Sequence, residues 1–287
     1  MAISSRTDAL ILGAGGRLGE ALSRLLPRYG LAISSVLRNQ TTANTRGVDV
    51  CSERDVTECI EAVRPRVVIY AAALSDPDRC ERHPSASHEV NVRGVCHTAA
   101  AASRIGSRVL YYSSDYVFGA PGTYCEDAQV APRQVYGRHK VEAEQVLLGD
   151  GDGDNVVMRL PLLFGNRDFV LAAVNAIKQG VPLRCDDRRR YPIPLEHVVE
   201  VTASIITSNA RRGIYHAVGV DGLTKVEWAN YIAGLLGKPA LVVAAAADKS
   251  AAPRPVDVEL GTRHPEMRAA AGTVWSATRA RVAELEM

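Results

Sequence analysis

Short apolar runs rich in β-branched residues alternate with segments of helical periodicity over the first 160 residues of the chain. Near-continuous apolar strands separated by helices are typical of a parallel sheet that helices cover on both faces. The pattern therefore predicts an α/β protein with a doubly wound parallel sheet. The expected strands are Ala9–Leu12, Ala32–Leu37, Val67–Ala73, Arg108–Tyr112 and Val156–Leu160, and the expected helices are Leu18–Leu26, Ser85–Ala102 and Lys140–Leu148.

The alternation weakens after residue 160, where proline residues recur. Proline interrupts helices and interior strands, which predicts a smaller and less regular lobe. The run Leu195–Thr207 is helical and apolar enough to pack against the main sheet. We therefore expect residues 1–160 to form the first domain, with a segment near 192–217 returning to it, and residues 161–287 to form most of a second lobe.

Composition excludes several classes of protein. Hydrophobic residues make up 47% of the chain and charged residues 23%, as in ordinary globular proteins. A formal net charge of +2 gives no strong field for nucleic acid or an anionic membrane. Six cysteines without a CxxC pair do not predict a metal site or a disulfide framework. No apolar run approaches the ~20 residues that span a bilayer, so we expect a cytoplasmic protein.

The first apolar strand leads directly into a turn rich in glycine, Gly13–Gly19. Gly13, Gly16 and Gly19 have the spacing GxxGxxG, which allows a tight turn, a close approach to a pyrophosphate and close packing of the next helix. The free N–H groups at the start of that helix then face the phosphate charge. A strand before and a helix after the turn favour a Rossmann-type dinucleotide site over a glycine-rich turn without a ligand.

The residues after the second strand indicate which dinucleotide binds. Sites that prefer NAD usually place an acidic residue about 20 positions after the glycines, against the ribose 2′-hydroxyl. From Ala21 to Val48 the chain has no acidic residue, whereas Arg38 ends the second strand and Arg17 lies in the glycine turn. A guanidinium pairs well with a 2′-phosphate. Unless both arginines are solvated surface charges, NADP(H) is predicted over NAD(H).

Tyr136 and Lys140 are four residues apart, so on a helix they share a face. A free phenol titrates near ~10 and a lysine near ~10.4. An ammonium beside the phenol stabilises phenolate, which is expected to lower the pKa of Tyr136. A hydroxyl from the Ser113–Ser114 pair would orient a substrate carbonyl against that phenol. The set predicts proton transfer coupled to hydride transfer.

With these motifs combined, the chain resembles the extended short-chain dehydrogenase/reductase family, and within it the dTDP-4-dehydrorhamnose reductase group. The resemblance implies a homodimer that reduces a keto group on a nucleotide sugar with NADPH. It rests on Gly13–Gly19, Asp49-Val50, Ala71–Ala73, Asp78–Glu81, Val90–Val92, Ser113–Phe118, Tyr136–Lys140 and Arg254-Pro255 near Leu260.

The resemblance also implies roles for the matching positions. The implied catalytic residues are Ser114, Tyr136, Lys140 and Asn91, the last holding a proton-relay water unless it is only an interior polar group. The expected cofactor-binding residues, the two arginines included, are Gly13, Gly16, Arg17, Leu18, Arg38, Asp49, Val50, Ala71, Ala72, Ala73, Tyr136 and Lys140. Asp49 would bind the adenine, or is simply a turn residue. The expected substrate-binding residues are Ser114, Asp115, Tyr116, Leu162 and Arg254.

Two positions and one loop depart from the pattern of the reductases. Leu162 stands where they usually carry an aromatic residue that packs on the sugar, and Gly261 stands where an aspartate commonly follows Leu260. The loop 186–192 is unusually basic, and it either contacts a phosphate or carboxylate or is a solvated charge run. The substrate is therefore less well defined than the chemistry.

Other members of the family leave alternatives open. The stretch Arg159–Gly165 and the Ser113–Ser114 pair are also similar to the β regulatory subunit of methionine adenosyltransferase, which binds NADP as a partner protein. A ketoreductase of a non-sugar substrate is a second alternative. A nucleotide-sugar epimerase that cycles NAD is a third, although it would favour an acidic residue after the second strand.

Overall fold

The computed structural model describes residues 7–38, 47–149, 154–165, 168–208, 210, 212–245 and 252–286 of the chain. Within these residues, six strands form one sheet in the order β10-β6-β4-β3-β1-β2, and every pair in it is parallel. The α/β class and the doubly wound parallel sheet predicted from the sequence are thereby confirmed. The strands are β1 (Ala9–Leu12), β2 (Ile33–Val36), β3 (Val67–Tyr70), β4 (Arg108–Ser114), β6 (Val156–Leu160) and β10 (Gly213–His216).

Two of the strand ends that differ from the prediction lie at the cleft. Strand β3 ends at Tyr70 rather than at Ala73, so residues 71–73 form a loop at the edge of the sheet. Strand β4 continues through Ser113 and Ser114, where Ser114 pairs in register with Leu160 of β6. The serine pair therefore lies at the carboxyl end of a buried central strand.

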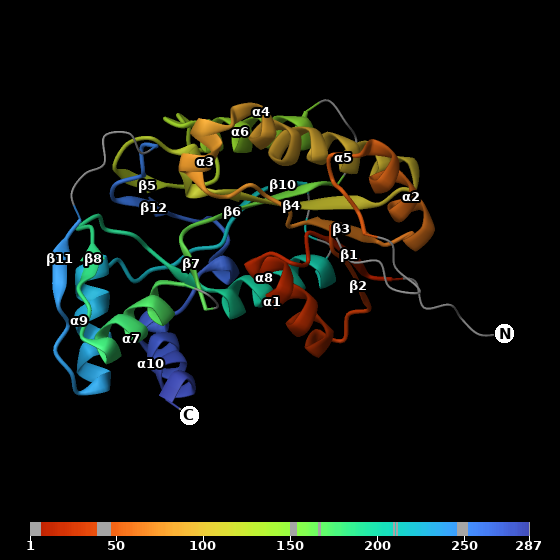
Figure 1. Ribbon diagram of the computed structural model, residues 1–287. Helices are drawn as coiled ribbons and strands as arrows, with labels where there is room; N and C mark the ends of the chain where they lie inside the picture. Colours follow the sequence, from red (N-terminus) through yellow and green to blue (C-terminus); the bar gives the residue numbers. More distant parts are fainter. Residues whose placement is uncertain are drawn as a thin grey trace.

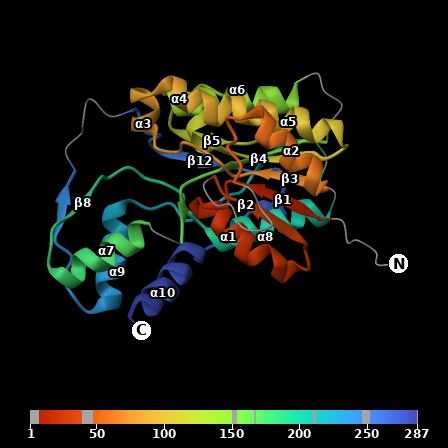
Figure 2. The same cartoon turned by 45° about the vertical axis from the view of Figure 1, so that its right-hand side comes forward.

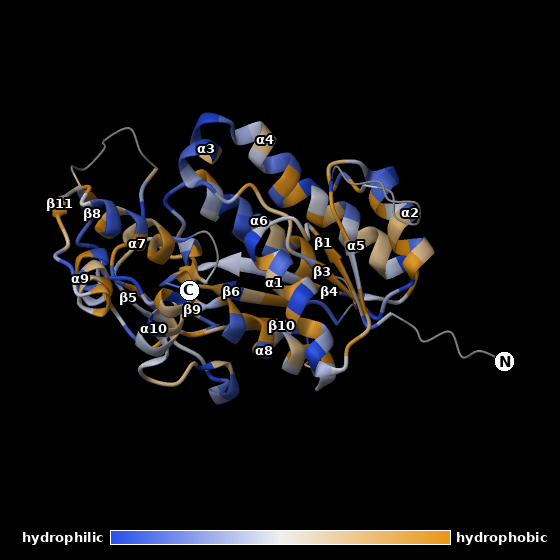
Figure 3. Ribbon diagram, turned by 60° about the horizontal axis from the view of Figure 1, so that its bottom comes forward, coloured by the Kyte–Doolittle hydropathy of each residue, from blue (hydrophilic) through white to orange (hydrophobic). Residues whose placement is uncertain are grey.

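Helices cover both faces of the sheet, as Figures 1 and 2 show. Helices α2, α5 and α6 pack over one apolar cluster, while α1 and α8 pack over the other. Figure 3 shows that the central strands are largely hydrophobic, whereas the short helix α3 is hydrophilic. The helices of this part are α1 (Arg17–Leu25), α2 (Glu53–Val63), α3 (Pro77–Arg82), α4 (Pro84–His88), α5 (Gly94–Arg104), α6 (Val135–Leu148) and α8 (Leu195–Thr207).

The single helix expected over Ser85–Ala102 is interrupted by a π-turn, Glu89–Arg93, between α4 and α5. The amide of Gly94 donates to the carbonyl of Glu89, five residues earlier. The Tyr70 hydroxyl donates to the carbonyl oxygen of Val90 at 2.5 Å. The prediction from periodicity missed this turn, which is accompanied by hydrogen bonds from Tyr70 and Leu74, both outside the helix. The widened turn directs Asn91 inward, and its side chain is fully buried.

A smaller lobe lies beside the sheet (Figures 1 and 2). It packs α7 (Phe169–Gln179), α9 (Lys225–Leu236) and α10 (Thr273–Glu286) around a core that contains Trp228 and Phe164. Two short parallel strand pairs belong to it: β7 (Leu163–Phe164) with β9 (Ile193–Pro194), and β8 (Leu183–Cys185) with β11 (Val242–Ala244). A third pair, β5 (Gly122–Tyr124) with β12 (Val258–Leu260), packs against Val117 and Phe118 after β4.

The chain returns from the lobe to the sheet before it ends. Helix α8 contacts α1, and β10 pairs with β6 as the edge strand of the sheet. Both elements come from the segment near 192–217 that was expected to return, while the division into two domains stays a prediction. Among the described residues, no helix is both long and apolar enough to cross a bilayer.

The glycine turn predicts a contrast between two substitutions. A Cβ on Gly19 would lie 2.8 Å from the Cα of Ala14 and closer still to the carbonyl oxygen of Gly13, whereas a Cβ on Gly234 meets nothing within 4 Å. Gly19→Ala should therefore lower the free energy of unfolding by about 1–3 kcal/mol. Gly234→Ala, within α9, should raise it by roughly 0.5–1 kcal/mol. Urea unfolding of the two variants measures both changes, and equal effects would show that the turn accommodates a methyl group.

Candidate functional site

A cleft of about 650 Å³ opens at the carboxyl ends of β1, β3, β4 and β6. Parallel strands direct the loops that follow them to one edge, where open α/β sheets bind their ligands. The cleft is lined by every residue that the sequence assigned to the cofactor: Gly13, Gly16, Arg17, Leu18, Arg38, Asp49, Val50, Ala71, Ala72, Ala73, Tyr136 and Lys140. Ser114, Asp115, Tyr116 and Leu162 line it too, whereas Asn91 and Arg254 do not.

The glycine turn has the shape that a pyrophosphate needs. Gly13 has a φ of +92°, and a Cβ there would lie 2.5 Å from the amide nitrogen of Ala72. Gly16 is the N-cap of α1, and no side chain caps that helix end. Gly16, Arg17 and Leu18 at the start of α1 line the cleft, and the start of a helix favours an anion, so the turn fits a bound phosphate group.

The two residues expected at the adenosine end contact each other. Arg38 donates from Nη2 to Asp49 Oδ2 at 3.0 Å, and its side chain is 68% exposed. Burial opposes ionisation of Asp49, but the amide of Cys51 and the guanidinium of Arg38 outweigh it and lower the pKa of Asp49. The pair therefore offers an ionised carboxylate and an accessible guanidinium at the same end of the cleft.

Arg17 extends from the glycine turn toward the smaller lobe. Its Nη2 donates to the carbonyl oxygen of Leu163 at 3.1 Å. The start of α1 is thereby joined to the segment that follows β6.

Ser114, Tyr136 and Lys140 meet at the carboxyl end of β4. The Ser114 hydroxyl donates to Asp115 Oδ1 at 3.0 Å, accepts from the amide of Tyr116 at 3.3 Å and interacts with the phenol of Tyr136. The ring of Tyr136 packs edge-on against that of Tyr116, with centroids 5.6 Å apart. The three residues of the predicted catalytic set are therefore close together.

The structure corrects the expected influence of Lys140 on Tyr136. Lys140 Nζ donates to the carbonyl oxygen of Tyr112 at 2.7 Å and lies 4.5 Å from the centroid of the Tyr111 ring. Burial lowers the pKa of Lys140 to about 7. Burial and the Asp115 carboxylate raise the pKa of Tyr136. The prediction that Lys140 lowers the pKa of Tyr136 is therefore wrong for this geometry, because desolvation of the buried phenol dominates.

Helix α6 is held against the sheet by a buried ion pair one turn beyond Lys140. Arg159 of β6 donates to both carboxylate oxygens of Glu144, at 2.7 and 3.0 Å. The side chains are only 3% and 6% exposed. The carboxylate of Glu144, which is paired with Arg159, raises the pKa of Lys140 and so offsets the burial only in part.

Asn91 holds the loop that follows β3. Its amide accepts from the nitrogen of Leu74 and donates to the oxygen of Leu74, each at 3.0 Å, and it also donates to Ser87 at 3.0 Å. Leu74 itself lines the cleft. Asn91 thus shapes the cleft from behind, and its role toward a proton-relay water stays a prediction.

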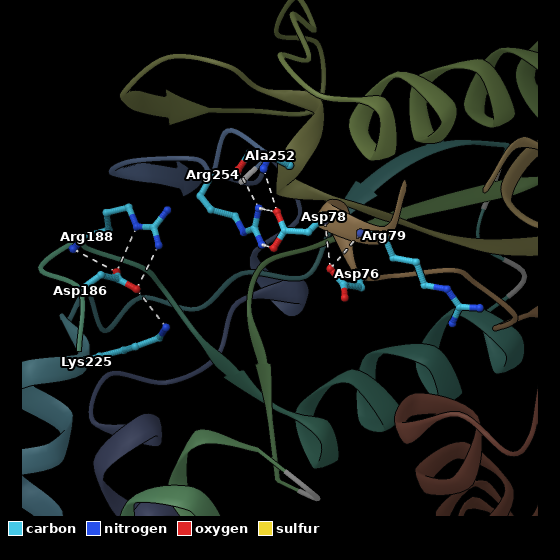
Figure 4. Close-up of polar contacts among 8 residues, drawn as sticks. All are labelled: Asp76, Asp78, Arg79, Asp186, Arg188, Lys225, Ala252 and Arg254. Carbon is cyan, nitrogen blue, oxygen red and sulfur yellow. Dashed lines mark hydrogen bonds and ion pairs between the residues drawn. The ribbon is translucent and has the colours of Figure 1, made fainter. Parts of the chain in front are cut away.

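Arg254 forms a clamp rather than part of the cleft wall. Its guanidinium donates to both oxygens of Asp78, at 2.6 and 2.8 Å, and the amide of Ala252 donates to the same carboxylate at 2.7 Å. The bonds from Arg254 lower the pKa of Asp78 to about 2. Figure 4 shows this pair, with the side chain of Arg79 directed away from it. In this structure Arg254 joins α3 to the C-terminal segment, and the substrate contact expected of it stays a prediction.

The sequence missed Arg190, which lines the cleft from the smaller lobe. Its Nη2 lies 2.7 Å from Asp115 Oδ2, and its guanidinium carbon lies 5.6 Å from the ring centroid of Tyr116. The basic run 186–192 was the only signal, since the partner lies 75 residues earlier. Its other arginines also bind within the chain: Arg188 pairs with Asp186 (Figure 4) and Arg189 with Glu227. Leu74, Ser75 and Arg79 line the cleft as well and were not predicted.

Similar proteins of known sequence include a reductase and a subunit of a methionine adenosyltransferase. The dTDP-4-dehydrorhamnose reductase of Aggregatibacter actinomycetemcomitans is 32% identical over 227 residues, which cover 73% of this chain and 72% of that protein. Methionine adenosyltransferase 2 subunit beta of Xenopus laevis is 27% identical over 266 residues, which cover 88% of this chain and 79% of that protein.

Solved structures have the same fold. A hypothetical dTDP-4-dehydrorhamnose reductase from Sulfolobus tokodaii has a TM-score of 0.79 and 28% identity, over 88% of this chain and 91% of that one. The Bacillus anthracis reductase in complex with NADP has a TM-score of 0.77 and 22% identity, over 88% and 89%. MoeE5 in complex with UDP-glucuronic acid and NAD has a TM-score of 0.83 and 20% identity, over 98% and 100%.

A family model described as the RmlD substrate binding domain matches residues 7–285. The match spans both the sheet and the smaller lobe, including the cleft with Ser114, Tyr136 and Lys140. The protein therefore belongs to the RmlD substrate binding domain family, within the dTDP-4-dehydrorhamnose reductase-like extended short-chain dehydrogenases/reductases.

Proposed function

We propose that this protein reduces a keto group on a nucleotide sugar with NADPH. The observation that carries the proposal is the meeting of Ser114, Tyr136 and Lys140 beside the glycine turn in one cleft. A pyrophosphate-shaped turn and a proton-donating set at the same sheet edge are the two halves of a carbonyl reduction. The homodimer and the cytoplasmic location expected from the sequence stay predictions.

The side chains suit the proton half of the reaction. When bound, NADPH supplies the hydride. Tyr136 donates its proton to the carbonyl oxygen, and its raised pKa means that the phenol keeps that proton until the oxygen gains charge. The hydroxyl of Ser114 donates a hydrogen bond to the same oxygen and so stabilises the developing negative charge. Lys140 holds the carbonyl of Tyr112 at the end of β4, two residues before Ser114.

The charges at the adenosine end favour NADPH over NADH. Related structures contain NADP in one case and NAD in another, so the preference is argued from the residues of this chain. Arg38 is exposed at the cleft, and no acidic residue occurs between Ala21 and Val48. A 2′-phosphate would pair with the guanidinium of Arg38 while Asp49 keeps that guanidinium in place.

The substrate end of the cleft is largely apolar. Leu74, Pro161, Leu162 and Leu163 line it near Ser114. An apolar wall favours a substrate with an alkyl substituent close to its ketone, as in a 4-keto-6-deoxy sugar. It disfavours a sugar that carries a hydroxyl group at every position near the ketone. With Leu162 in place of an aromatic side chain, the sugar is held by burial of this alkyl group rather than by stacking.

A regulatory NADP-binding subunit is the second candidate function. The match to methionine adenosyltransferase 2 subunit beta covers 88% of this chain, whereas the match to the reductase of A. actinomycetemcomitans covers 73%. Incubation of the purified protein with NADPH and a panel of keto-sugar nucleotides separates the two candidates. Oxidation of NADPH supports the reductase, and cofactor binding without any oxidation across the panel would favour the regulatory subunit.

Replacing Tyr136 with phenylalanine removes the transferable proton and keeps the ring. We expect Tyr136→Phe to leave the Kd for NADPH within about twofold of the wild type and to lower kcat by roughly a hundredfold or more. Fluorescence titration of NADPH and steady-state kinetics measure the two quantities. A variant that retained wild-type turnover would exclude Tyr136 as the proton donor.

Replacing Arg38 with aspartate tests the cofactor preference. The new carboxylate would lie beside Asp49 and repel a 2′-phosphate. Arg38→Asp should therefore raise the Kd for NADPH by roughly tenfold or more and the Kd for NADH much less. The ratio of the two dissociation constants is the measurement. Arg28→Asp, at an exposed position on the turn after α1, is the matched control and should leave that ratio unchanged.

The buried Lys140 predicts a pH dependence of stability. Its pKa falls from 10.5 to about 7 on folding, so between these values the unfolded chain binds the proton more readily. The contribution of Lys140 to the free energy of unfolding should therefore rise with pH across that window, by at most about 1.4 kcal/mol for each pH unit.

Unfolding in urea at pH 7 and at pH 9 measures this rise. Lys140→Met should lack that part of the rise, whereas Lys238→Met, which alters an exposed side chain, should keep it. The same slope in both variants would show that Lys140 remains charged in the folded protein.

A further inference from the structure

Arg190 belongs to the smaller lobe but acts on a residue of the sheet. Its backbone N–H and C=O each bond to Leu223 at 2.9 Å, and the neighbouring Arg189 donates to the carbonyl of Gly222 at 2.6 Å. These bonds fix the loop to the start of α9. From that anchored backbone, the guanidinium of Arg190 extends to Asp115 at the end of β4.

The two carboxylate oxygens of Asp115 bind different partners, one from the smaller lobe and one the neighbouring Ser114. Oδ2 of Asp115 accepts a hydrogen bond from Nη2 of Arg190 at 2.7 Å, and Oδ1 accepts one from the hydroxyl of Ser114 at 3.0 Å. The side chains of Asp115 and Arg190 are 3% and 13% exposed. Little water reaches this pair, so the guanidinium is the main compensation for the carboxylate charge among the described residues.

In this arrangement the hydroxyl proton of Ser114 is already used in a hydrogen bond to Asp115. A serine hydroxyl has a single proton to donate, and here it points to Asp115 rather than into the cleft. To hydrogen-bond a substrate carbonyl, Ser114 must turn away from Asp115. A carboxylate paired with a guanidinium is a weaker acceptor than an unpaired one, so Arg190 makes that turn easier.

The charge balance also acts on the proton donor. The Asp115 carboxylate raises the pKa of Tyr136, and the guanidinium of Arg190 lies next to that carboxylate and over the ring of Tyr116. Without Arg190, an unscreened negative charge would lie beside both groups that serve the carbonyl oxygen. The same substitution would thus hinder Ser114 and Tyr136 together.

We propose that Arg190 is a positioning residue for the reduction, which through Asp115 sets how firmly the Ser114 hydroxyl is held. Because the lobe carries Arg190, the packing of the lobe against the sheet contributes to how easily the Ser114 hydroxyl is released. This inference rests on the proposed reductase function.

A double-mutant cycle on kcat tests the route through Asp115. Arg190→Gln should lower kcat by roughly 10- to 100-fold, the effect of one charge-assisted hydrogen bond, while KM and the Kd for NADPH change less than threefold. Arg190→Lys should recover part of the loss, because it restores the charge without the planar fork. In an Asp115→Asn background, where no carboxylate competes for the Ser114 proton, Arg190→Gln should cost several-fold less.

Arg188→Gln is the matched control on the same loop. Arg188 pairs with Asp186, which keeps Lys225 as a second partner at 2.9 Å, so this variant should keep wild-type kcat. The doubly neutral Asp115→Asn/Arg190→Gln protein leaves no buried charge unpaired, so it can still be compared with Asp115→Asn if Arg190→Gln alone folds poorly. A loss of kcat of roughly 10-fold or more in that comparison would overturn the role of Arg190 through Asp115.

The outcomes separate this inference from the function on which it rests. An equal loss of kcat from Arg190→Gln in both backgrounds, or no loss in either, would overturn the role of Arg190 while leaving the reductase proposal intact. If the wild type oxidised no NADPH with any keto-sugar nucleotide of the panel, both the role of Arg190 and the reductase proposal would be overturned.

Discussion

The parallel pairing of β4 between β3 and β6 is the constraint on which the site depends. Parallel strands must all end at the same edge, so the loops after β3, β4 and β6 are forced together there. Ser114 is in register with Leu160, the last residue of β6, and so the Ser114 hydroxyl and the segment with Leu162 line the same cleft. Helix α6 then needs only to lie across β4 to bring Tyr136 and Lys140 to the same point.

Ion pairs between distant segments complete what the sheet begins. Arg159 joins β6 to α6 through Glu144, Arg190 joins the lobe to β4 through Asp115, and the clamp of Arg254 on Asp78 joins the C-terminal segment to α3. In each pair a largely buried or half-buried guanidinium neutralises a carboxylate that would otherwise be costly to desolvate. The pairs therefore fix the geometry around the cleft more than they add to stability.

Local motifs made the fold class and much of the cleft predictable. The turn Gly13–Gly19 combines its strand, its glycine spacing and its helix within one short segment, and all of the cofactor-binding residues predicted around it line the cleft. Tyr136 and Lys140 were found because helical spacing alone brings them together. Expectations of this kind depend on neighbours in sequence, which the pattern of residues records directly.

Features that depend on tertiary contacts were not predictable in the same way. The basic run around Arg190 was visible, but nothing in the sequence connects it to Asp115. The pKa of Tyr136 was predicted in the wrong direction because burial at the end of β4 depends on the packing of the whole sheet. The π-turn at Asn91 was missed because hydrogen bonds from Tyr70 and Leu74, both outside that helix, accompany it.

The position of β10 has a consequence for synthesis of the chain. The sheet reaches its last strand only at Gly213–His216, after the chain has passed into the lobe and returned. Until then β6, with the buried residues Val156 and Met158, has a free edge on the side away from β4. A nascent chain released at Leu160 would hold every glycine, serine and tyrosine of the site, yet its sheet would still be open.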